Sequence, residues 1–252
     1  MAWDTIAFLV LIGIFGGAWN AIAGGATLFT FPALIAAGLP PVVANATNYL
    51  ALLPSNAAAL PAYRRELETV GKTLVPLLVV SGAGAMIGSM LLLVTEEAAF
   101  LTLIPFLILA ATALFAFGER IHLWITGAVG DVSASGALYL VLFLSSIYGG
   151  YFGAGLGIIL LAIVQIMGFK SFFIANSIKN LLATSFTVLS IAVFGVGGLI
   201  AWPEAGVMMI GSTIGGYVGA RYARLVNESY LRIAVILFGL VLSAAYFAKT
   251  WG

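Results

Sequence analysis

The chain has 252 residues, of which 63% are hydrophobic and only 8% are charged, and its mean hydropathy is +1.17. A soluble domain carries about a quarter charged residues, so this composition excludes an ordinary soluble domain. Ten basic against nine acidic residues create no positive field for binding nucleic acid. The chain has no cysteine, which excludes disulfides, thiolate metal ligands and thiol catalysis.

The apolar runs predict an all-α polytopic membrane protein. A bilayer core takes about 20 residues of helix, and the alternating segments of an outer-membrane barrel are absent. No Lys or Arg precedes the first run, so we interpret it as a membrane segment and not as a cleavable signal peptide. In chain order the runs fall at 5–23, 26–38, 42–61, 73–94, 98–117, 136–152, 156–168, 172–194, 203–220 and 230–248.

Two of these runs are too short to span a membrane alone, and each follows a glycine cluster. The run 26–38 follows "GGAWNAIAGG", and the run 156–168 follows "GGYFGAGLG". Each run closes on a single glycine, which is Gly38 in the first half and Gly168 in the second. The two halves of the chain therefore resemble each other.

A third shared feature follows these glycines. The stretch "ANATN" at 44–48 is answered 131 residues later by "ANSIK" at 175–179. Membrane helices are generally rich in Gly and Ala, which is the alternative explanation, but the three features recur in the same order. We predict an internal duplication, with repeats at 1–122 and 123–252.

Loop charge predicts that the two repeats have opposite orientations. Lys and Arg favour the cytoplasmic side of a membrane. The basic loop residues are Arg64, Arg65, Lys72, Arg120, His122, Arg221 and Arg224. The loops at 95–97 and 195–202 have no basic residue and are expected outside. The basic loop 62–72 corresponds to the neutral loop 195–202, and the acidic loop 95–97 corresponds to the basic loop 221–229. We therefore predict inverted-topology repeats in a bacterial inner membrane, with both termini external.

Inversion also constrains the short runs. Each repeat must cross the membrane an odd number of times, and its last three long runs account for three crossings. The broken, Gly-rich pair at its start must then enter and return as a re-entrant hairpin. Irregular backbone at membrane depth is tolerated only inside protein or beside a water-filled cavity, and paired broken segments of this kind indicate a transport site.

Lys179 is the most informative residue in the second half. It lies nine residues beyond Lys170, which we expect to anchor at the cytoplasmic edge. At 1.5 Å per residue Lys179 is about 13 Å deeper, near the middle of the membrane, where an ammonium costs roughly 2.5–3.5 kcal/mol. We therefore expect Lys179 to face an acidic partner or an anionic ligand.

Polar residues surround Lys179 on one helix face, and a similar polar stripe occurs in the first half. Helical spacing places Asn176 and Asn180 beside Lys179, and Thr184 and Thr187 continue the face. Asn48 takes the position equivalent to Lys179, and Ser55 and Asn56 continue that stripe. With backbone N–H groups at the glycine turns, the predicted anion-binding residues are Lys179, Asn176, Asn180, Ser177, Asn45, Asn48, Thr47, Gly24, Gly25, Gly155 and Gly157.

Structural explanations compete with this assignment. Asp131 in "GAVGDVSASG" is the one acidic residue that is not clearly at a helix end or loop, so a salt bridge from Lys179 to Asp131 is the alternative partner. The Asn, Ser and Thr residues also bond helix to helix in many membrane proteins. Any single glycine is explained equally well by close helix packing.

The doubled pattern resembles the TauE/SafE sulfite exporter family. The resemblance is carried by "FGGAWNAIAGGATLFTFPALIAAGLPPVVANATN" and "YGGYFGAGLGIILLAIVQIMGFKSFFIANSIKN" and extends over nearly the whole chain. It implies export of sulfite, a related organosulfonate or another sulfur oxyanion across the inner membrane. The first half departs from the glycine-dense pattern at Asn20 and Ala23.

Other functions are less compatible with the residues present. An intramembrane enzyme would need paired carboxylates, a Ser/His pair or histidine ligands, and the one histidine, His122, is at a helix end. A passive channel or a permease for another small anion, such as thiosulfate or sulfate, remains the alternative. We predict no cofactor, metal or nucleic-acid partner; the expected partners are the anion and membrane lipid, and a homodimer is left open.

Overall fold

The computed structural model describes residues 1–252 except 23–24, 58–59, 130–135, 170, 223–227 and 252. The described residues form helices and short 3-10 turns without a β-strand. In the first half the helices are α1 (Trp3–Ile22), α2 (Thr27–Ala36), α3 (Pro41–Ala57), α4 (Arg64–Val70), α5 (Leu74–Val94) and α6 (Glu97–Val129), and the 3-10 turns are η1 (Pro61–Tyr63) and η2 (Gly71–Thr73). In the second half they are α7 (Gly136–Tyr151), α8 (Leu156–Ile166), α9 (Phe172–Val196), α10 (Trp202–Tyr222) and α11 (Glu228–Trp251).

The predicted runs are confirmed as helices, and two differences have physical reasons. The predicted loop 62–72 contains α4, a short helix with too little apolar sequence to register as a run. The run 98–117 continues as helix to Val129, because charged residues end a membrane segment without breaking a helix. Within the described residues, four segments are long and apolar enough to cross a membrane by themselves: Trp3–Ala21, Arg64–Val94, Glu97–Leu114 and Phe173–Val196.

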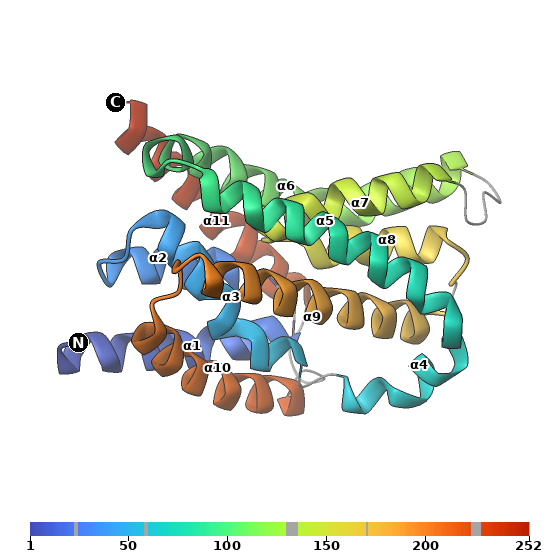
Figure 1. Ribbon diagram of the computed structural model, residues 1–252, viewed down its shortest axis with the longest axis horizontal. Coiled ribbons are helices and arrows are strands. Elements are labelled where there is room, and N and C mark those ends of the chain that lie inside the picture. The colour runs from blue at the N-terminus through green and yellow to red at the C-terminus, as the bar shows by residue number, and fades with distance from the viewer. Residues whose placement is uncertain (23–24, 58–59, 130–135, 170, 223–227, 252) are drawn as a thin grey trace.

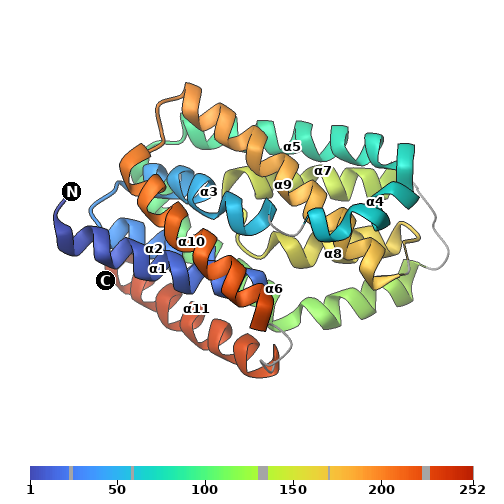
Figure 2. The same ribbon diagram turned by 90° about the horizontal axis from the view of Figure 1, so that it is seen from below.

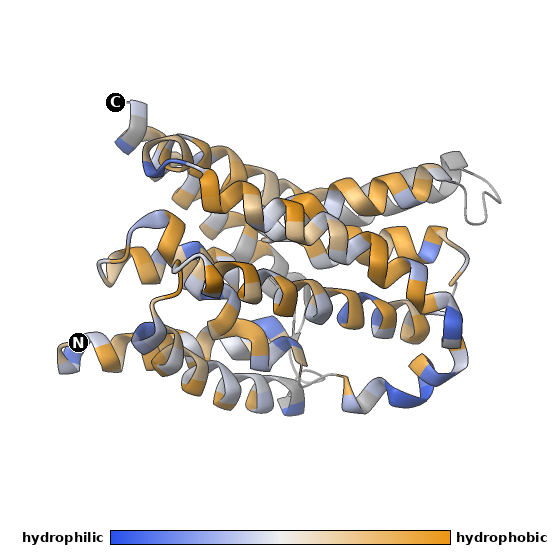
Figure 3. Ribbon diagram, viewed as in Figure 1, coloured by the Kyte–Doolittle hydropathy of each residue, from blue (hydrophilic) through white to orange (hydrophobic). Residues whose placement is uncertain are grey.

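The helices run mostly along the long axis of the molecule (Figure 1). Both chain termini lie at one end of that axis, and α4 lies toward the other end, an arrangement that the turned view also shows (Figure 2). Hydrophilic residues gather on α4, whereas the long helices are largely hydrophobic (Figure 3). This distribution is that of a multi-pass membrane protein.

Helices of the first half of the chain pack against helices of the second half. The helix α1 packs along α10, and α7 packs along α5. In both pairs glycines allow the backbones to touch: a Cβ on Gly215 would meet the Ile14 carbonyl, and a Cβ on Gly88 would meet the Ile147 carbonyl. Small residues of this kind permit close approach of membrane helices. The helices α3 and α9 pack against each other in the centre.

Two turns recur with the same geometry 130 residues apart. Gly25 and Gly155, which precede α2 and α8, both have φ = 76°. The Leu28 N–H donates to the Gly25 carbonyl at 3.1 Å, and the Ile158 N–H donates to the Gly155 carbonyl at 3.2 Å. Glycine adopts this left-handed conformation without steric cost, which explains why a glycine precedes both short helices.

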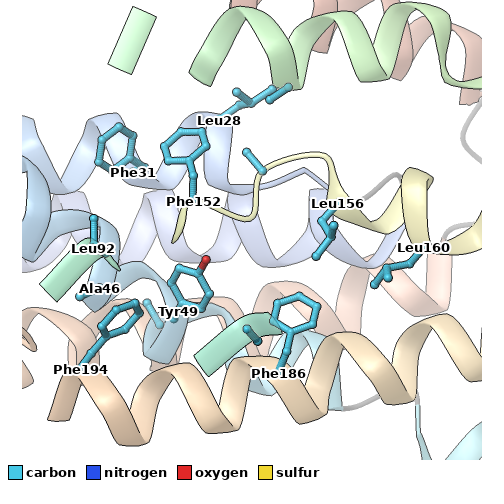
Figure 4. Close-up of a cluster of buried hydrophobic side chains, with 14 of the residues drawn as sticks. Leu28, Phe31, Ala46, Tyr49, Leu92, Phe152, Leu156, Leu160, Phe186 and Phe194 are labelled. Carbon is cyan, nitrogen blue, oxygen red and sulfur yellow. The ribbon is translucent and has the colours of Figure 1, made fainter. Parts of the chain in front are cut away.

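An aromatic core surrounds the break between α7 and α8 (Figure 4). Phe152 lies in the break and meets Phe31 of α2 edge to face, with ring centroids 5.5 Å apart. Tyr49 of α3 and Phe194 of α9 form a similar pair at 5.4 Å. These contacts hold the non-helical backbone inside protein, where Phe152 and Ala154 are buried.

Candidate anion-binding site

Lys179 lies in the first half of α9, beside the start of α8. Its Cδ atom is 3.9 Å from the point where a Cβ would sit on Gly157, so the aliphatic stem passes beside a residue that has no side chain. Lys179 is partly buried. Across the part of the chain that the structure describes, its ammonium has no hydrogen bond or ion pair, and the ion pair formed there is Arg64–Glu68.

The start of α8 adds one donor beside Lys179. The Leu156 and Ile158 N–H groups donate to the Gly153 and Gly155 carbonyls, which leaves the Gly157 N–H for a ligand. The first N–H groups of a helix have no partner within the helix, and the helix dipole makes this end favourable for an anion. Gly157 belongs to the first turn of α8, which begins after Gly155. The structure therefore brings together Lys179 and Gly157, two of the predicted binding residues.

The other predicted glycines lie elsewhere. Gly155 forms the N-cap of α8, and the atoms nearest to its would-be Cβ belong to Ala111 and Leu114 of α6. Gly25 takes the equivalent turn before α2. Gly24 lies outside the described residues, as does Asp131, the alternative partner of Lys179.

The polar stripe of α9 contains hydroxyl groups without partners. Thr184 Oγ1 and Ser190 Oγ are buried and find no hydrogen-bond partner among the described residues. Asn180 is partly buried. Ser177 lies in the core, but its hydroxyl donates to the Ile174 carbonyl at 2.7 Å within the same helix. The hydroxyl of Ser177 is thus used locally, whereas those of Thr184 and Ser190 are unused.

Asn176, one turn before Lys179, contacts the first half of the chain. Its Nδ2 atom donates to the Tyr63 hydroxyl at 2.9 Å. Tyr63 ends η1 and immediately precedes α4. This bond ties the segment between α3 and α5 to the helix that carries Lys179.

The corresponding stripe of α3 is largely satisfied. The Asn48 Nδ2 donates to Thr27 Oγ1 at 3.2 Å, and Thr30 Oγ1 donates to Asn48 Oδ1 at 2.5 Å. Thr47 Oγ1 accepts the Ala201 N–H at 3.0 Å, where α10 begins. Asn48 and Thr47 therefore connect helices in this structure.

The rest of the α3 stripe is bonded in the same way with one exception. Asn20 Nδ2 of α1 donates to Ser55 Oγ at 2.9 Å and to Asn56 Oδ1 at 2.8 Å. Asn45 is fully buried, and its Nδ2 donates to the Tyr151 carbonyl at 2.8 Å at the end of α7. The Asn45 Oδ1 atom has no partner among the described residues.

Tyr49 is a structural residue of this region that sequence reasoning did not single out. It is buried, and its hydroxyl donates to the Gly149 carbonyl at the end of α7. A Cβ on Gly153 would lie 2.8 Å from that hydroxyl. The available signal was its place next to Asn48 in the polar stripe. Together with Asn45, Tyr49 fastens α3 to the break that leads into α8.

The arrangement is suited to binding an anion. The Lys179 ammonium and the Thr184 hydroxyl have no partner among the described residues, and groups of these kinds donate hydrogen bonds to oxyanions. In the described part of the chain, no three Asp, Glu, His or Cys side chains gather where a metal ion would need them. The site thus has donors for an anion and no described set of metal ligands.

These features define a multi-pass helical membrane protein with a polar site beside a broken helix. The chain matches the family model "Sulfite exporter TauE/SafE" over residues 9–246 and belongs to this family. It is 31% identical to a probable membrane transporter protein of Haemophilus influenzae, over 96% of this chain and 94% of the relative. The predicted family is confirmed, and the chain is a membrane transporter.

Two further relatives have the same general character. The probable membrane transporter protein ORF9 of Sinorhizobium is 27% identical over 96% of this chain and 92% of its own length. The probable membrane transporter protein YfcA of Escherichia coli K12 is 26% identical over 95% of this chain and 88% of its own length. No solved structure matches the chain.

Proposed function

We propose that this protein exports a small sulfur oxyanion, sulfite or a related organosulfonate, across the bacterial inner membrane. The anion binds near the membrane midplane to Lys179, and amide, hydroxyl and backbone N–H groups complete the site. Alternating access arises as two inverted repeats, residues 1–122 and 123–252, move relative to each other, each built of a re-entrant hairpin and three spanning helices. Both termini face outward.

The observation that carries this proposal is the environment of Lys179. It is partly buried in an apolar bundle and has no carboxylate partner among the described residues. A buried charge without a counter-charge is unfavourable, so an anionic ligand is the natural partner. Half-helix N-termini receive anionic substrates in other transporters, and the first turn of α8 lies beside Lys179.

Three observations support the inverted repeats. The turns at Gly25 and Gly155 have the same φ angle and the same hydrogen bond. The exchanged packing of α1 on α10 and of α7 on α5 is the pattern that a two-fold relation between the repeats would produce. In Figure 1, α1 and α7 extend from opposite ends of the long axis, as two hairpins that enter from opposite sides would.

Export is also favourable for an anion. Moving one negative charge outward releases about 2.3 kcal/mol per 100 mV of inside-negative potential. A carrier of this kind saturates and shows counterflow, whereas a passive channel gives large single-channel currents. A panel of sulfite, sulfoacetate, thiosulfate and sulfate in proteoliposomes therefore separates the proposed substrate class from the alternative ones.

The proposal is tested by replacing Lys179. We expect Lys179→Gln to lower the apparent affinity for sulfite by roughly 10- to 100-fold, because a hydrogen bond to a charged group contributes about 1.5–3 kcal/mol. The protein should still reach the membrane and unfold cooperatively. Lys72→Gln is the matched control, since Lys72 is exposed on η2. Equal sulfite flux in wild type and Lys179→Gln would refute the proposed site.

A further inference from the structure

The helix α4 turns one acidic side chain toward the helix bundle. Its partly buried positions follow helical spacing, and its exposed positions lie between them. The partly buried residues of α4 are Glu66, Leu67 and Val70, and the exposed ones are Arg64, Arg65, Glu68 and Thr69. Tyr63, just before the helix, is also partly buried. Leu67 and Val70 pack against the hydrophobic core. Glu66 therefore occupies an inward position of an amphipathic helix, where a charge is unexpected.

One oxygen of this carboxylate is left without a partner. Glu66 Oε2 is shielded from solvent and has no hydrogen bond with any described residue. Glu68, two residues on, is exposed and accepts a hydrogen bond from Arg64 Nε at 2.9 Å. An unpaired buried carboxylate oxygen is unfavourable. A positively charged partner would therefore stabilise Glu66, and the described residues do not provide one.

The helix against which α4 packs carries one cation, Lys179, which has no ion pair among the described residues. The helix α4 packs against α9, and the Asn176–Tyr63 hydrogen bond of 2.9 Å joins them. Lys179 follows Asn176 by one helical turn, and Glu66 follows Tyr63 by three residues. Two unpaired groups of opposite charge thus lie within about one turn of the same hydrogen bond.

The other acidic residues with described side chains are less suitable. Asp4, Glu96, Glu97 and Glu204 lie at the helix ends opposite α4 (Figure 1). Glu97 accepts the Val42 N–H at 3.0 Å. Asp131 lies outside the described residues. The experiment below therefore tests it as the alternative partner of Lys179.

We propose that Glu66 is a built-in counter-anion for Lys179, which pairs with the ammonium when no substrate is bound and is displaced by the transported anion. This inference rests on the proposed function. Lys179 has a long, flexible stem, and α4 has only seven residues between two 3-10 turns; pairing requires that this segment move toward α9. The carboxylate then competes with the anion for Lys179 and covers the site from the α4 end.

The competition predicts an unusual mutant. Glu66→Gln keeps the shape of the side chain and removes its charge, so the purified full-length protein should bind sulfite about five- to tenfold more tightly than wild type. Glu68→Gln on the same helix and Asp131→Asn should stay within about twofold of wild type. Unchanged or weaker binding in Glu66→Gln would overturn the proposal. Tighter binding in Asp131→Asn alone would also overturn it, by assigning the counter-anion to Asp131.

Two additional measurements keep the test decisive. If Glu66→Gln does not fold, Glu66→Asp, whose shorter carboxylate reaches Lys179 less well, should give an intermediate tightening, and wild-type affinity there would refute the inference. Without sulfite, Glu66→Gln and Lys179→Gln should each lower Tm, and the double variant should lose less than the sum. Strictly additive losses would contradict the pair.

The outcome also separates this inference from the proposed function. If Lys179→Gln binds sulfite as wild type does, the anion site itself is wrong. If Lys179→Gln loses binding and Glu66→Gln matches wild type, the anion site stands and only the counter-anion role of Glu66 fails.

Discussion

The polar stripes of α3 and α9 occupy corresponding places in the proposed repeats, but their polar atoms are satisfied differently. On α3, the Asn48 amide is bonded at both its oxygen and its nitrogen to threonines of α2. On α9, the Lys179 ammonium and the Thr184 hydroxyl have no partner among the described residues. The α3 stripe holds helices together, and the α9 stripe retains donors that a ligand can use.

The contrast extends to the short helix beside each stripe. Thr27, in the first turn of α2, accepts a hydrogen bond from Asn48. The residue 130 positions later is Gly157, in the first turn of α8, and the stem of Lys179 passes beside it. A side chain at Gly157 would fill the space next to Lys179, whereas the Thr27 side chain closes the same place in the first half. Two residue differences therefore account for much of the asymmetry.

The largest expected effect comes from moving the charge between the stripes. Asn48→Lys places an ammonium where the side chain is 2% exposed and enclosed by Thr27 and Thr30. We expect a cost of about 2.5–3.5 kcal/mol and poor accumulation in the membrane, measured by detergent-solubilised yield and Tm. Lys179→Asn should still reach the membrane and lose sulfite flux. If the double variant transports sulfite, the two stripes are interchangeable and the comparison is wrong.

A medium effect should appear equally in both halves at the glycine contacts. Gly88→Ala and Gly215→Ala each place a Cβ against a carbonyl of the neighbouring helix, that of Ile147 and of Ile14. We expect each to lose about 1–3 kcal/mol of unfolding free energy through overpacking, measured by thermal or denaturant unfolding in detergent.

Gly206→Ala on α10 is the matched control, because nothing lies within 4 Å of its would-be Cβ. It should be neutral or slightly stabilising, since Ala favours a helix over Gly. A loss confined to one of the two contacts would show that the halves also differ in their packing, and the difference could no longer be assigned to the polar stripes alone.

The helices were largely predictable because long hydrophobic runs bounded by Gly, Pro or charged residues are typical of membrane helices. The short runs 26–38 and 156–168 correspond to α2 and α8. The helix α4 was missed because its seven residues depend on packing against α9 and carry little apolar periodicity of their own. The same omission hid Glu66, which reads as an ordinary loop acid in the sequence.

The site was only partly predictable from the sequence. Helical spacing placed Asn176 and Asn180 beside Lys179, since neighbours on one helix follow from periodicity. Contacts between helices require the tertiary structure, so neither the use of Thr47 at the start of α10 nor the bonding of Asn48 to α2 followed from spacing. A polar residue in a membrane helix looks the same in sequence whether it bonds a neighbouring helix or awaits a ligand.

The smallest expected effect separates these two kinds of polar residue. Asn48→Ala removes interhelical hydrogen bonds that contribute on average about 0.6 kcal/mol each in membrane proteins, so it should lower Tm and leave the KM for sulfite within about twofold of wild type. Thr184→Val removes a buried hydroxyl that has no described partner. Its stability should stay the same or rise slightly, because a buried unsatisfied group is unfavourable, while its KM should increase if the hydroxyl contacts the anion. The opposite pattern, with Asn48→Ala raising KM and Thr184→Val lowering Tm, would place the ligand on α3 and make the α9 stripe structural.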